Sequence, residues 1–245
     1  MKVIFIFSSL LISVYSLAQE QPYVDTISTK DSIKIAAYRT KLSQYVNPIP
    51  DSAIFYGKKI KALVTQLNYG KGIADSDYFL GTCFKRVQKN DSAIHYFKKS
   101  LALSEKLDYD IGKGRAHNNL GRTYYLLGKM DSSIIECKKA ILSIKEDAPI
   151  ARMIIADSYI ALATAYSRKN DMNNAITHLL KVDSMHQKSS LRPDIIAAAY
   201  QNLGNIYLEL EEFPSAIEQF KKANILFEKL PKGASQFYKI LPMYI

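Results

Sequence analysis

Few residues of this 245-residue sequence stand at spacings that support catalysis or metal binding. No Gly-x-Ser-x-Gly nucleophile elbow occurs, and the carboxylates are scattered without a marked acid/base pair. His117 falls on the stripe of a helix that is expected to face the core, and its side chain is predicted to be packed there. The sequence therefore predicts a chain that is not an enzyme and holds no metal or cofactor. The histidines form neither an HExxH pair nor a Cys/His set with zinc-site spacing; they are His95, His117, His178 and His186.

Two Gly-Lys-Gly stretches and two cysteines are the remaining residues that could take part in ligand binding or covalent chemistry. Neither stretch, at 70–72 and at 112–114, is followed by Ser or Thr as in a phosphate-binding loop. Both are therefore predicted to be turns between helices, where glycine supplies unusual backbone angles. Cys83 and Cys137 are predicted to be buried small hydrophobic side chains. A disulfide between them in an oxidising compartment is the alternative.

The composition is that of a globular protein, with 48% hydrophobic residues, 23% charged residues and a formal net charge of +10. The first residues, MKVIFIFSSLLISVYSLAQE, give a basic start, an apolar stretch and a small-residue ending at Ser16-Leu17-Ala18. This pattern predicts a signal peptide over 1–18, cleaved after Ala18, and an exported, periplasmic chain. An uncleaved membrane anchor is the alternative. A flexible linker is expected over 19–30, and no later stretch is apolar enough to cross a membrane.

A nine-residue pattern recurs along the chain and determines the predicted fold. The small residue in its third place recurs every 40 to 42 residues. A second pattern precedes the last four copies, as LGTCF (80–84), LGRTY (120–124), LATAY (162–166) and LGNIY (203–207). Both patterns have helical periodicity, and their small residues allow two helices to approach closely. The copies are DSAIFYGKK (51–59), DSAIHYFKK (91–99), DSSIIECKK (131–139), NNAITHLLK (173–181) and PSAIEQFKK (214–222).

Residues at the helix ends and on the helix surfaces support this division into helix pairs. Asp91 and Asp131 are candidate N-caps of second helices, and Gly128 is expected to close a first helix. Pro193 and Pro214 are expected in first turns, where a missing N–H costs nothing.

Lysine pairs that fall between core positions are predicted to face solvent. The alternative is a basic ladder that binds anionic lipid or cell-envelope polymers, with nucleic acid excluded as a partner. These pairs are 58–59, 98–99, 138–139 and 221–222.

The combined pattern, Leu-Gly-x-x-aromatic followed by Ala-x-x-x-aromatic-x-x-Ala, resembles the tetratricopeptide repeat (TPR) family. The resemblance covers 72–229 as four repeats, with a degenerate first repeat over 31–69. The period departs from the family's usual value of about 34 residues, and no proline closes the second helices. The resemblance implies an all-α fold, an α-solenoid in which antiparallel helix pairs form a right-handed superhelix over 31–229. A short C-terminal helix over 230–245 is expected as an incomplete cap.

In TPR proteins the inner face of the first helices binds peptides, and the resemblance carries this role to a set of residues here. Arginine and lysine in the set suit a partner that carries carboxylates. We therefore expect a non-catalytic exported scaffold for a protein or peptide partner; solvated polar residues without a function are the alternative. The layout also resembles the periplasmic sensor part of TPR-containing histidine kinases and regulators, here without an output domain. The implied binding residues are Tyr78, Thr82, Lys85, Arg86, Arg115, Asn118, Arg122, Tyr125, Arg168, Gln201 and Asn205.

Overall fold

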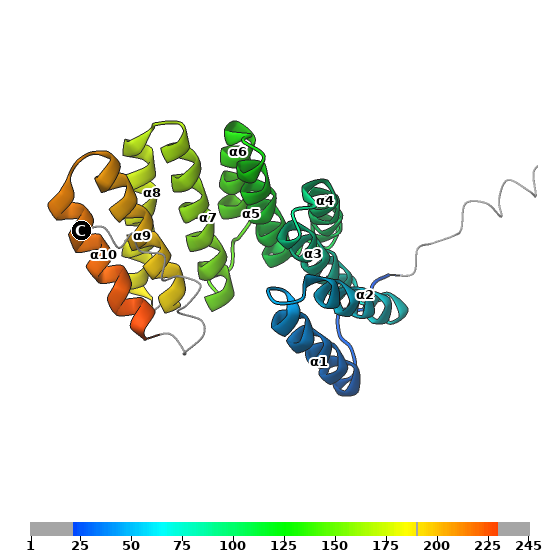
Figure 1. Ribbon diagram of the computed structural model, residues 1–245. Helices are drawn as coiled ribbons and strands as arrows, with labels where there is room; N and C mark the ends of the chain where they lie inside the picture. The colour runs from blue at the N-terminus through cyan, green and yellow to red at the C-terminus, as the bar shows by residue number, and fades with distance from the viewer. Residues whose placement is uncertain (1–21, 190, 230–245) are drawn as a thin grey trace, which may run out of the picture.

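The computed structural model describes residues 22–189 and 191–229. The predicted signal peptide and the predicted C-terminal helix lie outside the described residues. Within them the chain forms ten α-helices in five antiparallel pairs (Figure 1). We call the first helix of each pair the A helix and the second the B helix. The A helices are α1 Thr29–Tyr45, α3 Gly70–Arg86, α5 Asp110–Leu126, α7 Pro149–Arg168 and α9 Pro193–Glu209; the B helices are α2 Pro50–Gln66, α4 Asn90–Lys106, α6 Met130–Leu142, α8 Met172–Lys188 and α10 Phe213–Glu228.

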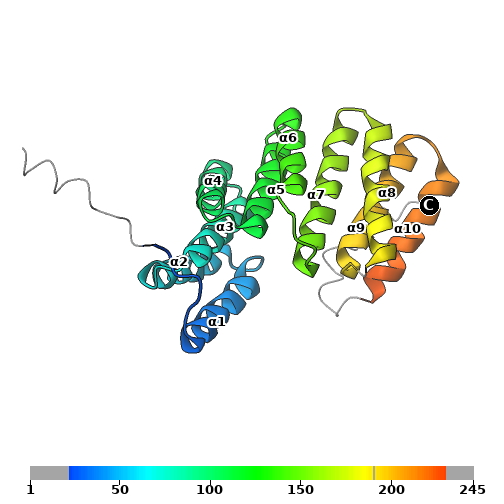
Figure 2. The same ribbon diagram turned by 180° about the vertical axis from the view of Figure 1, so that it is seen from behind.

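The helix pairs stack in chain order, from α1 at one end to α10 at the other (Figures 1 and 2). Each helix packs on the next one along the chain. The A helices α3, α5, α7 and α9 also pack on one another, whereas the described B helices make no comparable contacts among themselves. Closer spacing of one layer means that the stack curves toward it, so the A helices form the concave side. The predicted all-α solenoid is confirmed.

Small residues lie where the helices approach most closely, as the repeat pattern predicts. The third-place residues Ala53, Ala93 and Ala175 are fully buried. A Cβ atom placed on Gly81 would lie 2.6 Å from the Phe97 ring, so the Leu-Gly position of an A helix admits the aromatic ring of its B helix. Any larger residue at this glycine would force the two helices apart, because protein interiors are closely packed.

The Gly-Lys-Gly stretches are not turns, contrary to the sequence-based prediction. They form the first turns of α3 and α5. A Cβ atom on Gly72 would lie 2.3 Å from the ring of Tyr69, and one on Gly112 would lie 2.3 Å from the Ser104 hydroxyl. These glycines are therefore selected for close packing at the start of a helix. A need for a special backbone angle does not explain them.

Six of the described turns, those after α2, α3, α4, α5, α7 and α9, instead use a residue in the left-handed region directly after the helix C-cap. After α5 this residue is Gly128, with φ of +73°, as expected; after α9 it is Glu211, with φ of +60°. The amide of the following residue then donates to a carbonyl of the last helical turn, as in the bond from Glu212 to Tyr207 at 2.8 Å. These are Schellman caps, which satisfy carbonyl groups that the helix leaves free.

Because the chain enters the next helix straight from this cap, the B helices begin earlier than predicted. The N-caps of α4 and α6 are Lys89 and Lys129, and neither forms a side-chain cap. The predicted N-caps Asp91 and Asp131 lie within the first turns. Their carboxylates there complement the positive end of the helix dipole.

Replacing Glu211 by glycine is expected to stabilise the fold by about 0.5–1 kcal/mol. A left-handed backbone costs a residue with a Cβ roughly 1–2 kcal/mol, which exceeds the extra entropy that glycine loses on folding. Urea unfolding followed by circular dichroism measures the change. Glu212→Gly is the matched control, because Glu212 has φ of −84° and gains nothing from glycine. Equal stabilisation by both variants would contradict the backbone explanation.

Several smaller predictions concern individual side chains. Both cysteines are buried free thiols, and burial raises the pKa of Cys83 to about 11. His117 is buried, with its Nδ1 atom 2.8 Å from Glu136 Oε2. All eight lysines of the four pairs are exposed, as predicted. Pro193 and Pro214 stand in the first turns of α9 and α10.

None of the helices in the described ranges is long and apolar enough to span a membrane.

Candidate functional site

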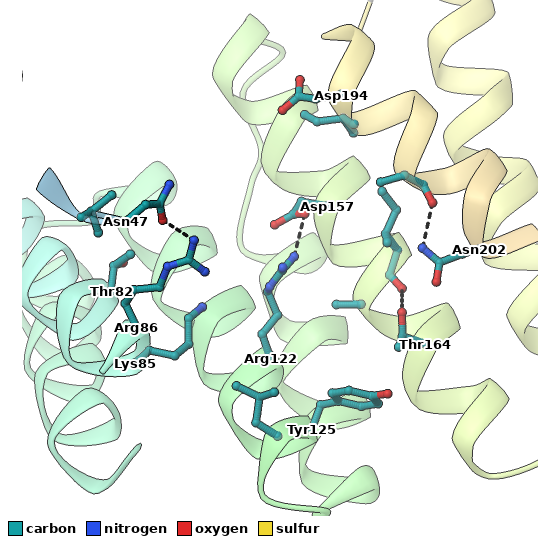
Figure 3. Close-up of a pocket in the computed structure, with 16 residues that line it drawn as sticks. Asn47, Thr82, Lys85, Arg86, Arg122, Tyr125, Asp157, Thr164, Asp194 and Asn202 are labelled. Atoms are coloured by element: carbon teal, nitrogen blue, oxygen red, sulfur yellow. Dashed lines mark hydrogen bonds and ion pairs between the residues drawn. The ribbon is translucent and has the colours of Figure 1, made fainter. Parts of the chain in front are cut away.

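The concave side contains a groove of about 670 Å³ that crosses four A helices (Figure 3). Its lining comes from α3, α5, α7 and α9, with two residues from the turn between α1 and α2. The groove thus joins segments that lie more than 100 residues apart in the sequence. The lining residues are Val46, Asn47, Thr82, Lys85, Arg86, Arg122, Tyr125, Leu126, Asp157, Ile160, Ala161, Thr164, Asp194, Ile195, Ala198 and Asn202.

One end of the groove carries two cations whose bonded partners are neutral. The Nζ atom of Lys85 donates to Asn119 Oδ1 at 2.6 Å, and the Arg86 guanidinium donates to Asn47 Oδ1. The amide of Asn119 is itself held by a 3.2 Å bond to the carbonyl of Arg115, which keeps its oxygen toward Lys85. Neither cation forms an ion pair with any carboxylate of the described residues. The described part of the fold therefore leaves both basic side chains without a paired carboxylate.

The lysine of this pair lies in a setting that disfavours its charged form. The Phe97 ring, whose centre lies 5.8 Å from its Nζ atom, favours the ammonium form, but burial and the neighbouring cations outweigh this contact. Burial, followed by the positive charge of Arg122, lowers the pKa of Lys85 to about 7. Arg86 acts in the same direction, and Asp157 opposes both. Desolvation and like charges act together here, as expected for an amine held among cations in a partly closed site.

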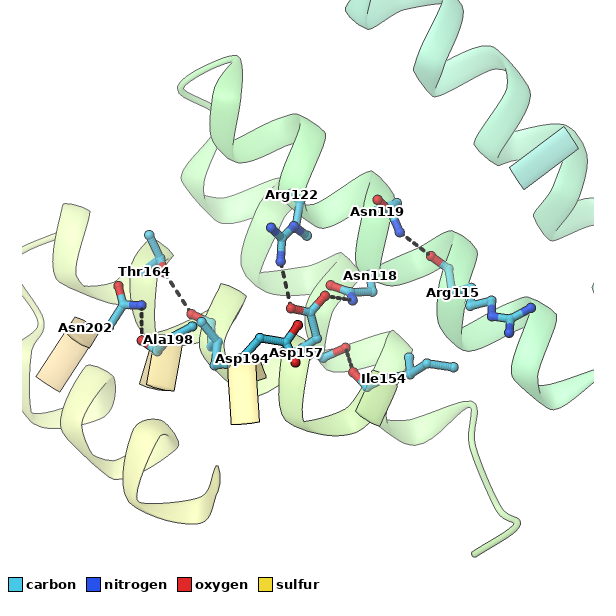
Figure 4. A network of polar contacts seen from close by, with 12 residues as sticks. Arg115, Asn118, Asn119, Arg122, Ile154, Asp157, Thr164, Asp194, Ala198 and Asn202 are labelled. Atoms are coloured by element: carbon cyan, nitrogen blue, oxygen red, sulfur yellow. Dashed lines mark hydrogen bonds and ion pairs between the residues drawn. The ribbon is translucent and has the colours of Figure 1, made fainter. Parts of the chain in front are cut away.

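The third cation of the groove is paired. Arg122 Nη1 lies 2.8 Å from Asp157 Oδ1, and Asn118 Nδ2 donates to Asp157 Oδ2 at 2.8 Å (Figure 4). Each oxygen of this carboxylate thus accepts one bond from α5. Asn118 is 4% exposed, so its amide serves to hold Asp157 and has little surface left for a partner. The network couples α5 to α7 and fixes the Arg122 guanidinium in the groove.

Beyond this network the groove becomes apolar. Ile160 and Ala161 of α7 and Ile195 and Ala198 of α9 line this part, which we call the aliphatic shelf. Thr164, the next polar lining residue on α7, donates its hydroxyl to the carbonyl of Ile160 at 2.8 Å. Its hydroxyl proton is thereby used within the helix, and the oxygen is left only as an acceptor. Asp194, at the start of α9, is held by the Arg192 guanidinium.

A second hollow of about 480 Å³ continues the groove along α7 and α9. It shares Tyr125, Thr164 and Asn202 with the first hollow and adds Arg168 and Asn205. Arg168 Nε donates to the Tyr125 hydroxyl at 3.2 Å, which bridges α5 and α7. Amide side chains in such a place can pair with the backbone of an extended segment.

Of the eleven binding residues that the family resemblance implied, seven line one or both hollows in the structure and four do not. Five line the first hollow: Thr82, Lys85, Arg86, Arg122 and Tyr125. Arg168 and Asn205 line the second, where Tyr125 reappears.

The other four implied residues line neither hollow. The Arg115 guanidinium lies 3.1 Å from Asp75 and over the ring of Tyr78 at 5.7 Å, so both residues belong to a separate cluster. Asn118 serves the Asp157 network, and Gln201 is partly exposed outside both hollows. Of the four implied basic residues on α3 and α5, Lys85, Arg86 and Arg122 therefore line the groove, whereas Arg115 is paired with Asp75 outside it.

Other lining residues escaped the sequence-based prediction. Asn47 belongs to the degenerate first repeat, where the repeat pattern gives no alignment. The aliphatic shelf was missed because its residues resemble core positions; Ile160 and Ala161 are only 7% and 8% exposed. The spacing of Ile195 and Ala198, three apart on an A helix, was the available signal.

Comparisons with known proteins agree with this architecture. Tetratricopeptide repeat models match residues 72–141, 156–188 and 197–224, which together make up more than half of the chain. The crystal structure of BtubC from P. vanneervenii has a TM-score of 0.59 at 14% identity, covering 88% of this chain and 95% of that one. MamA gives a TM-score of 0.50 at 20% identity, covering 83% and 97%.

The apo form of RapI is also similar, with a TM-score of 0.58 at 16% identity, covering 90% of this chain and 59% of that one. At these identities the likenesses show the fold alone. The comparison with curated proteins finds no match. The repeat models, the helix pairs and the stacked A helices together show that the chain belongs to the tetratricopeptide repeat family.

Proposed function

We propose that the chain is a non-catalytic scaffold whose concave groove binds an extended, carboxylate-bearing segment of a protein partner. The observation that supports it most is the pair Lys85 and Arg86, whose bonded partners are neutral amides. Arginine and lysine both form strong charge-assisted hydrogen bonds to carboxylates. An incoming carboxylate at this end of the groove supplies the counter-charge that the fold omits.

The aliphatic shelf supplies the second half of the recognition. Lys85 reaches from α3 to Asn119 of α5, so the shelf on α7 and α9 lies about one to two helix spacings beyond its amine, each roughly 8–10 Å. An extended chain advances about 3.3 Å per residue, and its side chains alternate between faces. A carboxylate and an aliphatic side chain that both face the groove must therefore be an even number of residues apart, about four. The proposed partner segment has an acidic residue followed or preceded by a leucine-like residue at that spacing.

Binding of capped synthetic heptapeptides to the purified chain tests this function. The probe AEAAALA has its glutamate and leucine four residues apart. Fluorescence anisotropy is expected to show saturable binding, weakened about tenfold or more in AQAAALA, which lacks the charge, and in AEAAAAA, which lacks the buried methyl groups. AEAALAA, in which the leucine faces the opposite side, is the register control, and its affinity is expected to be as low as that of the other two variants. Equal affinity for all four peptides would overturn the proposal.

Export is a separate part of the proposal and rests on residues 1–18 alone. A basic start, an apolar stretch and the ending Ser16-Leu17-Ala18 support secretion with cleavage at that point. N-terminal sequencing of the protein from a bacterial envelope fraction is expected to begin at Gln19. A chain that keeps Met1 in the cytoplasmic fraction would rule the export out.

A further inference from the structure

Lys85 faces charged groups from three helices. Arg86 lies on its own helix α3, Arg122 comes from α5, and Asp157 comes from α7. The only other acidic group that lines the groove, among the described residues, is Asp194 of α9, and the Arg192 guanidinium holds it. Asp157 is already held by Arg122 and Asn118. The surroundings of Lys85 therefore leave a further positive charge on its amine poorly compensated.

Neutral and charged forms of this amine can occupy the same place. Asn119 Oδ1 accepts a hydrogen bond from Lys85 at 2.6 Å, and an uncharged amine can still donate this bond, although more weakly than an ammonium group does. A change of protonation thus requires no rearrangement of the groove. Because burial and Arg122 lower its pKa to about 7, a large share of the amine is uncharged in the empty groove at neutral pH.

We propose that Lys85 takes up one proton from solvent when the partner's carboxylate enters the groove, so that binding is proton-linked and weakens as the pH rises. The inference rests on the proposed function and adds its regulation. A carboxylate beside Lys85 and Arg86 supplies the negative charge that stabilises the ammonium form. The bound carboxylate thereby stabilises the charged form of Lys85 that holds it. A rise in pH removes this charge and weakens the binding.

The direction of the pH dependence follows from linkage. Below about pH 7 Lys85 is already charged in the empty groove, so affinity stays level. Above it, the bound state holds more protons than the free state, and affinity falls by up to about tenfold per pH unit. The fall ends where the amine of the bound state loses its own proton, at most near the ordinary lysine pKa of about 10.4.

The first test measures Lys85 in the whole chain by competitive amine labelling across pH, with mass spectrometry of the labelled peptides. Reactivity of Lys85 is expected to rise with a midpoint near neutrality, well below the ordinary lysine pKa of about 10.4. Saturating AEAAALA is expected to move the Lys85 midpoint upward and to leave the labelling of the exposed Lys98 and Lys99 unchanged. A midpoint for Lys85 near the ordinary lysine value in the empty protein would overturn the inference.

The second test counts protons by calorimetry at about pH 7.5 in two buffers of different ionisation enthalpy. Binding of AEAAALA is expected to take up between half a proton and one proton per complex. Lys85→Arg, which is charged at every pH of the experiment, is expected to show neither the proton uptake nor the pH dependence in the binding that it retains. Lys98→Arg is the matched control and is expected to leave both unchanged.

The outcomes separate this inference from the proposed function. Binding of AEAAALA without proton uptake would leave the function in place and overturn the inference. If the peptide fails to bind, the labelling is repeated with inorganic phosphate against chloride at equal ionic strength. An upward shift of the Lys85 midpoint with phosphate would then support proton-linked anion binding while the peptide proposal falls; no shift would overturn both.

Discussion

Replacing Lys85 and Arg86 together by glutamate is expected to reduce the affinity for AEAAALA by about 100-fold or more. The change removes the two cations whose bonded partners, within the part of the chain that the structure describes, are amides, and puts two carboxylates in their place. A peptide glutamate would then meet like charge in a partly closed groove, where charge interactions are weakly screened. The same variant is expected to bind AQAAALA about as well as the unaltered chain does.

Circular dichroism and anisotropy on the same preparations check this prediction. The helix content and the midpoint of thermal unfolding should stay close to those of the unaltered chain, because neither side chain is part of the apolar core. Lys98→Glu with Lys99→Glu is the matched control: it reverses the same amount of charge on the outer B helix α4, where both lysines are exposed. Equal loss of binding in both double variants would mean that net charge, and not the groove, governs affinity.

Truncating Phe97 to alanine is expected to cost about 3–5 kcal/mol of unfolding free energy, the largest single effect on stability. Phe97 is fully buried, and its ring fills the space beside Gly81 between α3 and α4. It also touches the ring of Tyr78, with the two centroids 6.1 Å apart. Because Gly81 has no side chain, the α3 wall of the cavity at this point is helix backbone, which cannot collapse into it.

Urea unfolding monitored by circular dichroism measures this loss. In a solenoid each repeat is stabilised by its neighbours, so a weak second repeat is expected to broaden the transition as well as shift it. The exposed Lys98→Ala on the same helix is the control and should change stability by less than about 0.5 kcal/mol. A cost below about 1 kcal/mol for Phe97→Ala would contradict the close packing at this position.

The repeat pattern contained most of the information about the fold. Small residues at Ala53 and Ala93 and the paired Gly81 and Phe97 recur because helix packing needs them, so their period reveals the helix pairs directly. Prediction was wrong where one residue type serves two purposes. Gly72 stands in a helix for packing, and Gly128 is the one described glycine that lies in a turn, while Glu211 occupies the same backbone region without being a glycine. Sequence alone does not separate these uses.

The site was less predictable because it depends on which side chains satisfy one another. Position on an A helix was enough to place Lys85, Arg86 and Arg122 on the inner face. It did not show that Arg115 is neutralised by Asp75 or that Asn118 is buried beneath Asp157. Such pairings join residues 39 or 40 positions apart, in neighbouring repeats, and depend on the angle between successive helix pairs.

Nuclear Overhauser contacts between a bound peptide and isoleucine methyl groups test the central claim most directly. The chain is labelled at isoleucine methyls and mixed with AEAAALA. The leucine of the peptide is expected to contact the methyl groups of Ile160 and Ile195 on the aliphatic shelf, and these contacts should vanish with Lys85→Glu and Arg86→Glu combined. Contacts with Ile135 and Ile225 instead, which are exposed on the B helices α6 and α10, would contradict binding in the concave groove.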